Sequence, residues 1–153
     1  MPRAAIIIIQ DNAIALIERH RAGFHYFLFP GGKAEDGETL EQAAVREARE
    51  EMGIEVACGS LVAQVQFAGA DPDRRDQFYF LATVTGGEFG SGDGPEYDGT
   101  EPAENGTYAP VWMPLTELHQ WDVRPSAVAA LAIGSLSSGW PEDVALITEG
   151  EHV

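Results

Sequence analysis

The chain has 153 residues, 44% of them hydrophobic and 9% aromatic, which is typical of one folded domain with its own core and not of a disordered segment. Its 25 acidic and 9 basic residues give a formal charge of −16, which argues against long nucleic acid and anionic membranes as partners, because both are bound through basic surfaces. We therefore expect a single domain over residues 1–153, and a homodimer is left open.

The first part of the chain predicts three strands. Ala4–Ile9 is a continuous apolar, β-branched run, as in a strand that is buried on both faces near the centre of a sheet. Asp11-Asn12 is a turn signal, and Ala13–Glu18 resumes as a second strand, which predicts a hairpin. Phe24–Phe29 is an aromatic strand that Pro30–Gly32 terminates.

The helix that follows carries signals at both ends. After the loop Lys33–Glu38, Thr39 and Gln42 form a T-x-x-Q capping box, and good helix formers then run to Met52. Gly53 suits the position just past a helix end, because glycine adopts the left-handed conformation required there. We expect this helix to be the best-defined element of the chain.

The rest of the chain predicts three more strands and a second helix, without regular alternation of strands and helices. This order favours a mixed sheet covered by helices. A long segment rich in Gly, Pro and acidic residues separates two of these predicted strands. Long loops of this kind are typically lids, binding loops or passive insertions. The predicted elements are strands over Ile54–Phe67 and Gln77–Thr85 with a polar turn over Gly69–Asp76, the long loop Gly86–Gly106, a strand over Tyr108–Pro114, a helix over Ser126–Leu136 introduced by Pro125, and no motif from Ser137 onward.

Three carboxylates crowd the second half of the first predicted helix. At about 100° per residue, Glu47, Glu50 and Glu51 share one face. Like charges four residues apart repel each other, and anions also oppose the dipole at a helix C-terminus. A hard divalent cation such as Mg²⁺, which takes oxygen ligands, would reverse that penalty. The alternative interpretation is an acidic face screened by solvent.

The spacing around these carboxylates matches a known motif. From Gly32, five residues lead to Glu38 and seven more to Arg46-Glu47, followed by the remaining positions up to Ile54. This resembles the Nudix box, G-x5-E-x7-R-E-U-x-E-E-x-G-U, at every fixed position, with Ala48 as a small residue in an apolar slot. The wider run PGGKAEDGETLEQAAVREAREEMGI is similar to the MutT-type members of that family.

The resemblance implies an α/β/α sandwich with a mixed sheet, and hydrolysis of a nucleoside diphosphate linked to another group. Such a reaction would depend on Mg²⁺, with Mn²⁺ as an alternative. By position, Glu47, Glu50 and Glu51 resemble the metal-binding and base-assisting carboxylates of the family. The backbone carbonyl of Gly31, or of Gly32, resembles a further metal ligand.

Other residues are expected to complete the candidate site. Glu38 and Arg46 resemble the acid and base that brace the loop against the helix. Lys33, on the Gly-Gly loop, either contacts phosphate or is a solvated lysine. The long loop contains several carboxylates, one of which we expect at the metal, with Glu96 assigned there ahead of Glu101 and Glu104. We further predict that this loop becomes ordered when metal and nucleotide bind, the alternative being a passive insertion.

The remaining chemically active side chains form no motif. Cys58 is the only cysteine, so neither an internal disulfide nor a cysteine-cluster metal site can form, and the N-terminal apolar run is too short to span a membrane and has no secretory features. We therefore expect a cytoplasmic protein. No metal-ligand spacing connects the histidines, which we assign to the surface or to strands: His20, His25, His119 and His152. Each of five aromatic residues could stack on a base or lie in the core: Tyr26, Phe67, Tyr79, Tyr97 and Tyr108.

The favoured function is a pyrophosphohydrolase that cleaves a (deoxy)nucleoside triphosphate or a related small nucleotide by attack of water on phosphorus. Dinucleoside polyphosphates and ADP-sugars are the next substrates. A nucleotide-sensing module without turnover is an alternative from another class, although a pure binder has no need of the three box glutamates. An enzyme for capped or polymeric RNA conflicts with the strong negative charge.

Overall fold

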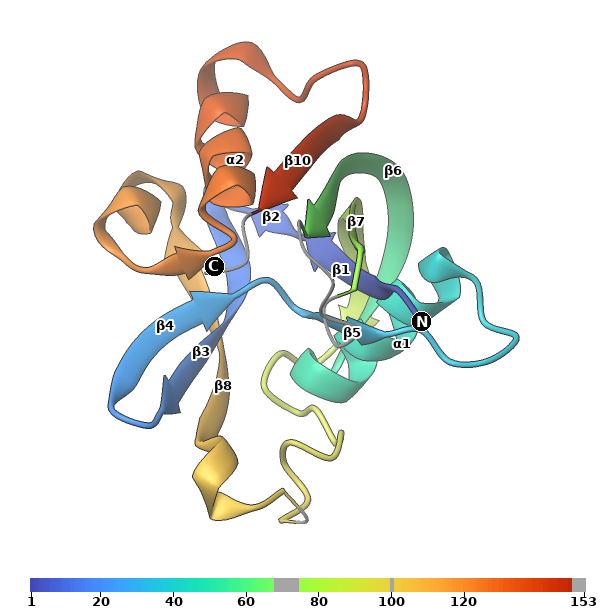
Figure 1. The fold of residues 1–153 in the computed structure, drawn as a ribbon, viewed down its shortest axis with the longest axis vertical. Helices are drawn as coiled ribbons and strands as arrows, with labels where there is room; N and C mark the ends of the chain where they lie inside the picture. The colour runs from blue at the N-terminus through green and yellow to red at the C-terminus, as the bar shows by residue number, and fades with distance from the viewer. Residues whose placement is uncertain (68–74, 100, 150–153) are drawn as a thin grey trace.

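The computed structural model describes residues 1–67, 75–99 and 101–149, and Figure 1 shows their arrangement. Among these residues, no helix is both long and apolar enough to cross a membrane. The elements are, in chain order, β1 (Arg3–Ile7), β2 (Ile9–Gln10), β3 (Ala13–Arg21), β4 (Phe24–Leu28), β5 (Gly31–Lys33), α1 (Leu40–Met52), β6 (Ile54–Phe67), β7 (Gln77–Gly87), η1 (Ala103–Asn105), β8 (Thr107–Pro114), η2 (Leu115–Gln120), β9 (Val123–Arg124), α2 (Ser126–Ser138) and β10 (Ala145–Glu149).

The strands form two sheets between the two helices, which confirms the predicted α/β/α sandwich. One sheet has the order β10-β6-β7-β1-β5 and is mixed, because β1 pairs with β7 in parallel and with β5 antiparallel. In the other sheet, β3 pairs antiparallel with β2, β4 and β8, and β9 joins β4 in parallel. In Figure 1, α2 lies at the upper left and α1 at the lower right, with strands between them.

We predicted one strand over the first apolar run, Ala4–Ile9, but the structure divides this run between two strands, β1 and β2. Residues up to Ile7 pair within the first sheet, whereas Ile9 already pairs with Ile14 of β3 in the second. β1 itself is flanked by β7 and β5, so it is an interior strand, as its apolar composition predicts. The predicted hairpin follows, with Asp11 and Asn12 both at positive φ in its turn.

Alternate side chains of β1 enter two separate cores, because successive residues of a strand point to opposite faces. Ala4 and Ile6 pack with a cluster on the side of α1, and Ala5 and Ile7 pack with a cluster on the side of α2. The first cluster receives buried residues of α1: Ala43, Ala44, Ala48 and Met52. These small side chains bring the helix backbone close to the sheet, and that closeness positions the acidic residues of the same helix.

The ends of α1 match the sequence prediction. The Gln42 N–H donates to the Thr39 hydroxyl at 3.1 Å, and the Thr39 N–H donates to the Gln42 side-chain oxygen at 2.9 Å, which completes a capping box. At the other end, Gly53 adopts a φ of 78° and its N–H donates to the Arg49 carbonyl. The helix is therefore defined at both ends by its own sequence.

Removal of the cap should weaken the protein by a small, measurable amount. We expect Thr39→Ala to lower the free energy of unfolding by about 1 kcal/mol, since an N-terminal N–H of the helix loses its acceptor. Urea denaturation would measure the change. Thr116→Ala is the matched control, because Thr116 is exposed in η2. Equal losses in the two variants would contradict a capping role for Thr39.

Several elements differ from the sequence prediction. Gly31–Lys33 forms the short strand β5 instead of a strand terminator and loop. The segment after Ser137, which carries no motif, contributes β10, which pairs in parallel with the end of β6. A five-residue strand that is only half-buried has too weak an alternation to be recognised alone, and the pairing with β6 makes it a strand. Of the predicted turn Gly69–Asp76, residues 69–74 lie outside the described residues.

Candidate active site

The box residues meet where α1 packs on β5. Pairing of β5 with β1 places Gly31 opposite Ala5 and Gly32 opposite Ala4. Gly32 lies against the Glu47 carboxylate so closely that a Cβ atom at position 32 would overlap it. At Gly31 the N–H points to Glu51 and donates to its Oε2 at 3.4 Å. The two glycines thus form the wall against which two carboxylates of the helix lie.

Three carboxylates converge on this wall. Glu47, Glu51 and Glu96 each place one oxygen so that all three oxygens lie within 4.8 Å of one another. Glu47 and Glu51 are 7% and 8% exposed, and Oε2 of Glu96 is buried without a hydrogen-bond partner among the described residues. A buried carboxylate oxygen without a donor is costly. The donor set is that of a hard divalent cation, so the residues fit Mg²⁺ or Mn²⁺.

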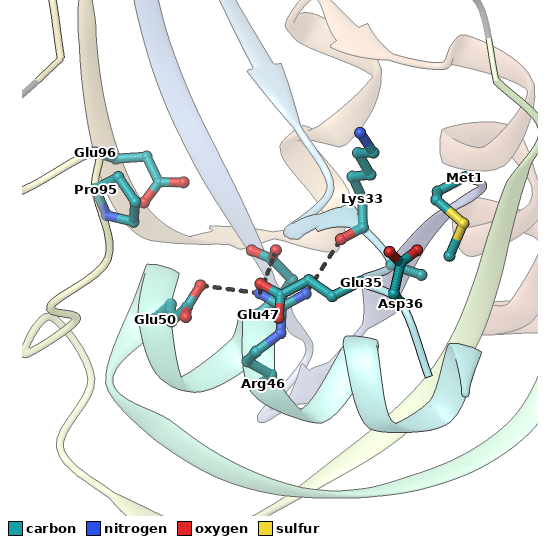
Figure 2. A pocket seen from close by; sticks show the side chains of 10 residues that line it. Met1, Lys33, Glu35, Asp36, Arg46, Glu47, Glu50, Pro95 and Glu96 are labelled. Atoms are coloured by element: carbon teal, nitrogen blue, oxygen red, sulfur yellow. Dashed lines mark hydrogen bonds and ion pairs between the residues drawn. The ribbon is translucent and has the colours of Figure 1, made fainter. Parts of the chain in front are cut away.

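The long loop brings Glu96 to the helix through backbone hydrogen bonds. Glu88 donates to the Gly53 carbonyl at 3.1 Å, Gly90 to Met52 at 2.8 Å and Gly94 to Glu50 at 2.9 Å. These carbonyls lie at the C-terminal end of α1, where the helix itself provides no donors. The first half of the loop therefore caps α1, and Glu96 faces the cleft from this loop (Figure 2).

Burial makes the charge of the cluster unfavourable in the metal-free protein. It raises the pKa of Glu47, although the neighbouring Arg46 opposes this shift. It raises the pKa of Glu51 well above the ordinary value, and repulsion from Glu47 and Glu96 adds to this effect while Arg3 opposes it. A bound cation would remove this cost, because it favours the charged form of each carboxylate.

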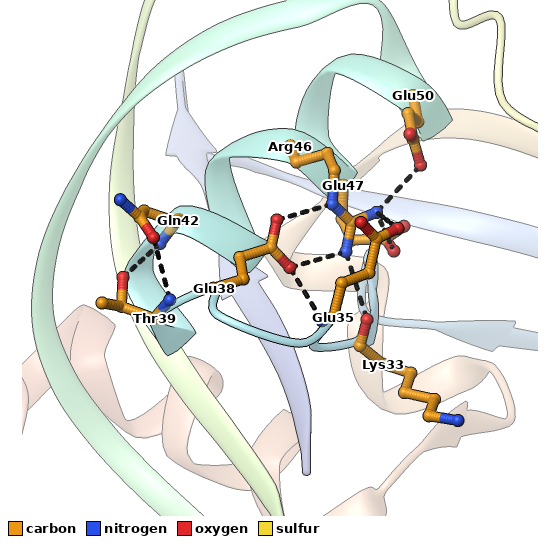
Figure 3. A network of polar contacts seen from close by, with 8 residues as sticks. All are labelled: Lys33, Glu35, Glu38, Thr39, Gln42, Arg46, Glu47 and Glu50. Atoms are coloured by element: carbon orange, nitrogen blue, oxygen red, sulfur yellow. Dashed lines mark hydrogen bonds and ion pairs between the residues drawn. The ribbon is translucent and has the colours of Figure 1, made fainter. Parts of the chain in front are cut away.

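Arg46 lies beside the cluster and uses all five of its N–H groups, one of them on Glu47 (Figure 3). Nε and Nη2 form a fork on the Glu38 carboxylate at 2.8 and 3.0 Å, and Nη2 also donates to the Lys33 carbonyl at 3.1 Å. Nη1 donates to Glu47 at 2.9 Å and to Glu50 at 3.1 Å. Glu38 in turn accepts from the Glu35 N–H at 3.0 Å. The guanidinium therefore connects β5, the following loop and α1.

The predicted metal ligands are not all in one place. Glu50 lies on Arg46, with a side chain that is 30% exposed, and is not part of the three-carboxylate cluster. Glu101 accepts a hydrogen bond from Asn105 at 2.5 Å, and Glu104 is exposed in η1. Of the three loop carboxylates considered from the sequence, the structure brings Glu96 to the cluster.

Two clefts open beside the carboxylates. One of about 550 Å³ is lined by Lys33, Arg46, Glu50 and Pro95, and another of about 300 Å³ by Arg3, Arg19, Phe29 and Tyr108; Lys33, Glu47 and Glu96 line both. Anionic and cationic side chains thus line two adjacent clefts that share three of these residues. This arrangement suits a ligand that carries phosphate groups together with a cation.

Sequence reasoning missed Arg3 and Arg19. Arg19 is only 6% exposed, and its Nε donates to the Thr107 carbonyl at 3.1 Å while its guanidinium lies 3.7 Å from the Tyr108 ring centre. The signal that could have found it is an arginine two residues after Ile17, in phase with the inward positions of β3. Tyr108, one of the aromatic candidates, thereby reaches the cleft.

A methyl group at Gly32 should impair the site without unfolding the protein. We expect Gly32→Ala to displace the Glu47 carboxylate and to lower kcat by at least about tenfold for the compound that the substrate panel proposed below selects, because small displacements of catalytic groups have large effects. Gly134→Ala is the matched control, since a Cβ atom there meets open space. Steady-state kinetics and melting temperatures of both variants test this, and unaltered kcat in Gly32→Ala would contradict the close contact.

Comparison with known proteins assigns the fold and the motif to a family. Residues 1–132 match the NUDIX domain. An 8-oxo-dGTP diphosphatase from Escherichia coli is 35% identical over 130 residues, which are 82% of this chain and 89% of the relative. An ADP-ribose pyrophosphatase from Methanocaldococcus jannaschii is 41% identical over 91 residues, 57% of this chain but only 53% of the relative.

A solved structure supports the same assignment at the level of the fold. A NUDIX hydrolase from Nitrosomonas europaea superposes with a TM-score of 0.70 at 19% identity, over 98% of this chain and 80% of that one. The family match covers the box at Gly32–Ile54, both glycines of the wall and the loop that carries Glu96. With its box, its sandwich and these relatives, the chain belongs to the Nudix hydrolase family.

Proposed function

We propose that the protein is a metal-dependent pyrophosphohydrolase of small purine nucleotides, with nucleoside triphosphates as first substrates. The observation that supports this most is the buried cluster of Glu47, Glu51 and Glu96, in which one oxygen lacks a donor. Glu47 and Glu96 line both clefts and Glu51 lines the smaller one, where the cationic Lys33 and Arg3 also lie. A cation and a phosphate chain would together complete the charges of this space.

Each group has a role in this proposal. Glu47, Glu51 and Glu96 would hold Mg²⁺ or Mn²⁺, which when bound would supply polarisation of phosphoryl oxygens and a lowered pKa of bound water. Lys33 and Arg3 contact phosphate oxygens, the first as a point charge and the second through its fork. Glu50, the more exposed box carboxylate, is held at the cleft wall by Arg46 and accepts a proton from the attacking water.

The nucleoside would occupy an apolar hollow next to the phosphate site. This hollow, of about 290 Å³, is lined by Phe29, Phe67, Tyr79 and Arg124. It shares Arg3 and Phe29 with the cleft of about 300 Å³ described above. Phe29 and Tyr79 contact edge to face with ring centres 5.6 Å apart. Both rings are almost fully buried, so they form an apolar floor on which a flat base could rest, not free faces for stacking. The names of both relatives above contain a purine nucleotide, which supports purines as the first bases to test.

The deciding experiment is a substrate panel with phosphate and pyrophosphate measured separately. It includes dGTP, 8-oxo-dGTP and other triphosphates, ADP-ribose as the second candidate, dinucleoside polyphosphates and a NAD-capped RNA. We expect hydrolysis of a diphosphate linkage in Mg²⁺ and none in EDTA. Full activity in EDTA, or cleavage only of compounds without a diphosphate linkage, would overturn the proposal. Binding of a triphosphate without turnover would favour the sensing module.

The metal should also stabilise the folded protein. Because an ion bound only to the folded state adds free energy by mass action, about 2.7 kcal/mol at 100 times its Kd, we expect Mg²⁺ or Mn²⁺ to raise the melting temperature by about 5–10 °C. EDTA should reverse the rise. The double variant Glu51→Gln/Glu96→Gln should lose most of the metal-induced rise in melting temperature. An equal rise in that variant would place the ion elsewhere.

A further inference from the structure

The β3–β4 hairpin carries a second group of metal-ligating side chains, remote from the box. β3 and β4 are joined by the two-residue turn Ala22-Gly23, with φ of 52° and 82°, and their register places His20 directly opposite His25. Glu18 lies two residues before His20 on the same strand and therefore on the same face. One ligand atom from each of the three residues lies within 4.8 Å of the other two.

The three side chains of this group already lie against one another. Nε2 of His25 lies 2.7 Å from Oε2 of Glu18, and Nε2 of His20 lies 3.7 Å from the same oxygen. The two imidazole rings stack at 4.2 Å with 8° between their planes. Their side chains are 58% and 35% exposed, and that of Glu18 is 28% exposed. An ion can therefore reach the three ligands from solvent without opening the fold.

We propose that Glu18, His20 and His25 bind one divalent transition-metal ion, Zn²⁺ in the first place, through two imidazole nitrogens and one carboxylate oxygen. Water would complete a tetrahedral shell. Imidazole ligands select Zn²⁺, Ni²⁺ or Cu²⁺ over Mg²⁺, whereas the all-carboxylate cluster of the candidate active site suits Mg²⁺. The chain thus carries two metal sites of different chemistry, and the hairpin site does not depend on the function proposed above.

Small movements would suffice to form this centre. Tetrahedral zinc with bonds of about 2.0–2.1 Å separates its ligands by about 3.3 Å. The 3.7 Å between His20 and Glu18 is close to that value, and the ion would replace the hydrogen bond between His25 and Glu18. Since stacked rings cannot both point at one ion, the ring of His20 has to turn, and its exposure permits this. The backbone pairing of the hairpin already holds the three residues together.

The site faces away from the proposed catalytic clefts. Ile17 and Arg19 alternate with Glu18 and His20 along β3 and line the smaller cleft, so the proposed ion lies on the other face of the same strand. There the rings of His25 and Trp121 pack edge to face, with ring centres 5.6 Å apart. An ion on the hairpin would link β3 to β4 beside Trp121 and would touch none of the carboxylates of the box.

Binding is tested with tag-free protein in excess Mg²⁺, which keeps the acidic cluster occupied, by titration of Zn²⁺ against a chromophoric chelator. We expect the wild-type protein to bind one Zn²⁺ per chain. Each of the variants His20→Ala, His25→Ala and Glu18→Gln should lower the affinity of the protein for Zn²⁺ more than about tenfold. His119→Ala and Glu51→Gln, outside the group, should leave the affinity unchanged. No Zn²⁺ held against the chelator, or equal affinity in the His25→Ala variant, would overturn the proposal.

Trp121 gives a second readout that locates the ion. Because Cu²⁺ quenches a nearby indole, we expect Cu²⁺ to quench the fluorescence of the wild-type protein in excess Mg²⁺ and to quench the His25→Ala variant much less. Trp121→Phe should remove the quenched component and leave the emission of Trp112 and Trp140. Circular dichroism of each variant verifies the fold. Quenching that persists without Trp121, or without His25, would place the ion elsewhere and contradict the proposed site.

Discussion

Replacement of Glu51 by glutamine is expected to lower turnover by orders of magnitude and, at the same time, to stabilise the metal-free protein. Glu51 places a buried carboxylate beside those of Glu47 and Glu96. Glutamine keeps its shape and removes one of the anionic oxygens that the proposed cation requires. We expect kcat with the substrate from the panel to fall at least about 100-fold, since loss of a metal ligand exceeds the effect of losing an outer partner.

The gain in stability follows from the direction of the pKa shift. Folding raises the pKa of Glu51 above its ordinary value of 4.5, mainly through burial. The metal-free protein therefore loses stability as the pH rises from that value through the raised pKa, because the folded state resists the charge that the unfolded state accepts. Glutamine carries no such charge, and its amide can donate to Glu47, which Glu51 can do only when protonated.

Thermal unfolding in EDTA, between about pH 5 and pH 8, tests the stability half of this prediction. The melting temperature of Glu51→Gln should exceed that of the wild type near pH 8, and the difference should narrow toward pH 5. Glu55→Gln is the matched control, because Glu55 is exposed at the start of β6. In Mg²⁺ the wild type should instead have the higher melting temperature of the two. A lower melting temperature of the metal-free variant at every pH would show that the buried charge is already compensated.

The first helix and its surroundings could be predicted because their signals are local. The capping residues Thr39 and Gln42, the terminal Gly53 and the box spacing all lie within a short stretch, and each acts on neighbours a few residues away. The fold class followed from the order of such elements and from the family resemblance. The division of the first apolar run at Ile8 could not be predicted in this way, because the chain changes sheets there according to which strands lie beside β1 and β2.

The composition of the site was harder to predict than its position. Helical spacing places Glu47, Glu50 and Glu51 on one face, but the direction of each carboxylate depends on Arg46, whose donors hold Glu50 away from the cluster. The third carboxylate comes from a loop that hydrogen-bonds to the end of the helix, so its identity depends on backbone contacts far apart in sequence. The same reason hid Arg19 and the hairpin histidines, which strand pairing brings to their partners.

The second large effect is expected at Arg46, where a lysine should not replace the arginine. All five N–H groups of Arg46 have acceptors, three of which are the carboxylates of Glu38, Glu47 and Glu50. Lysine keeps the charge, but it has one nitrogen with three donors and cannot form the fork on Glu38 while it reaches α1 and the Lys33 carbonyl. Buried acceptors would then lose their donors.

We expect Arg46→Lys to lower the free energy of unfolding by about 2 kcal/mol, or the melting temperature by about 4–8 °C for a domain of this size. The side chains of Arg46 and Glu38 are only 15% and 14% exposed, so solvent screens this pair little. Arg49→Lys is the matched control on the same helix, because Arg49 is exposed. This variant should change the free energy of unfolding by less than about 0.5 kcal/mol.

The dependence on pH distinguishes loss of this ion pair from a general packing defect. The hydrogen bond from Arg46 lowers the pKa of Glu38 below its ordinary value of 4.5. The stabilisation from the pair is therefore present above that value and is lost as the pH falls through the lowered pKa. The difference in stability between wild type and Arg46→Lys should shrink over that range, as measured by urea denaturation at each pH. A difference that stays constant there would mean that lysine disturbs packing and that the pair with Glu38 contributes little.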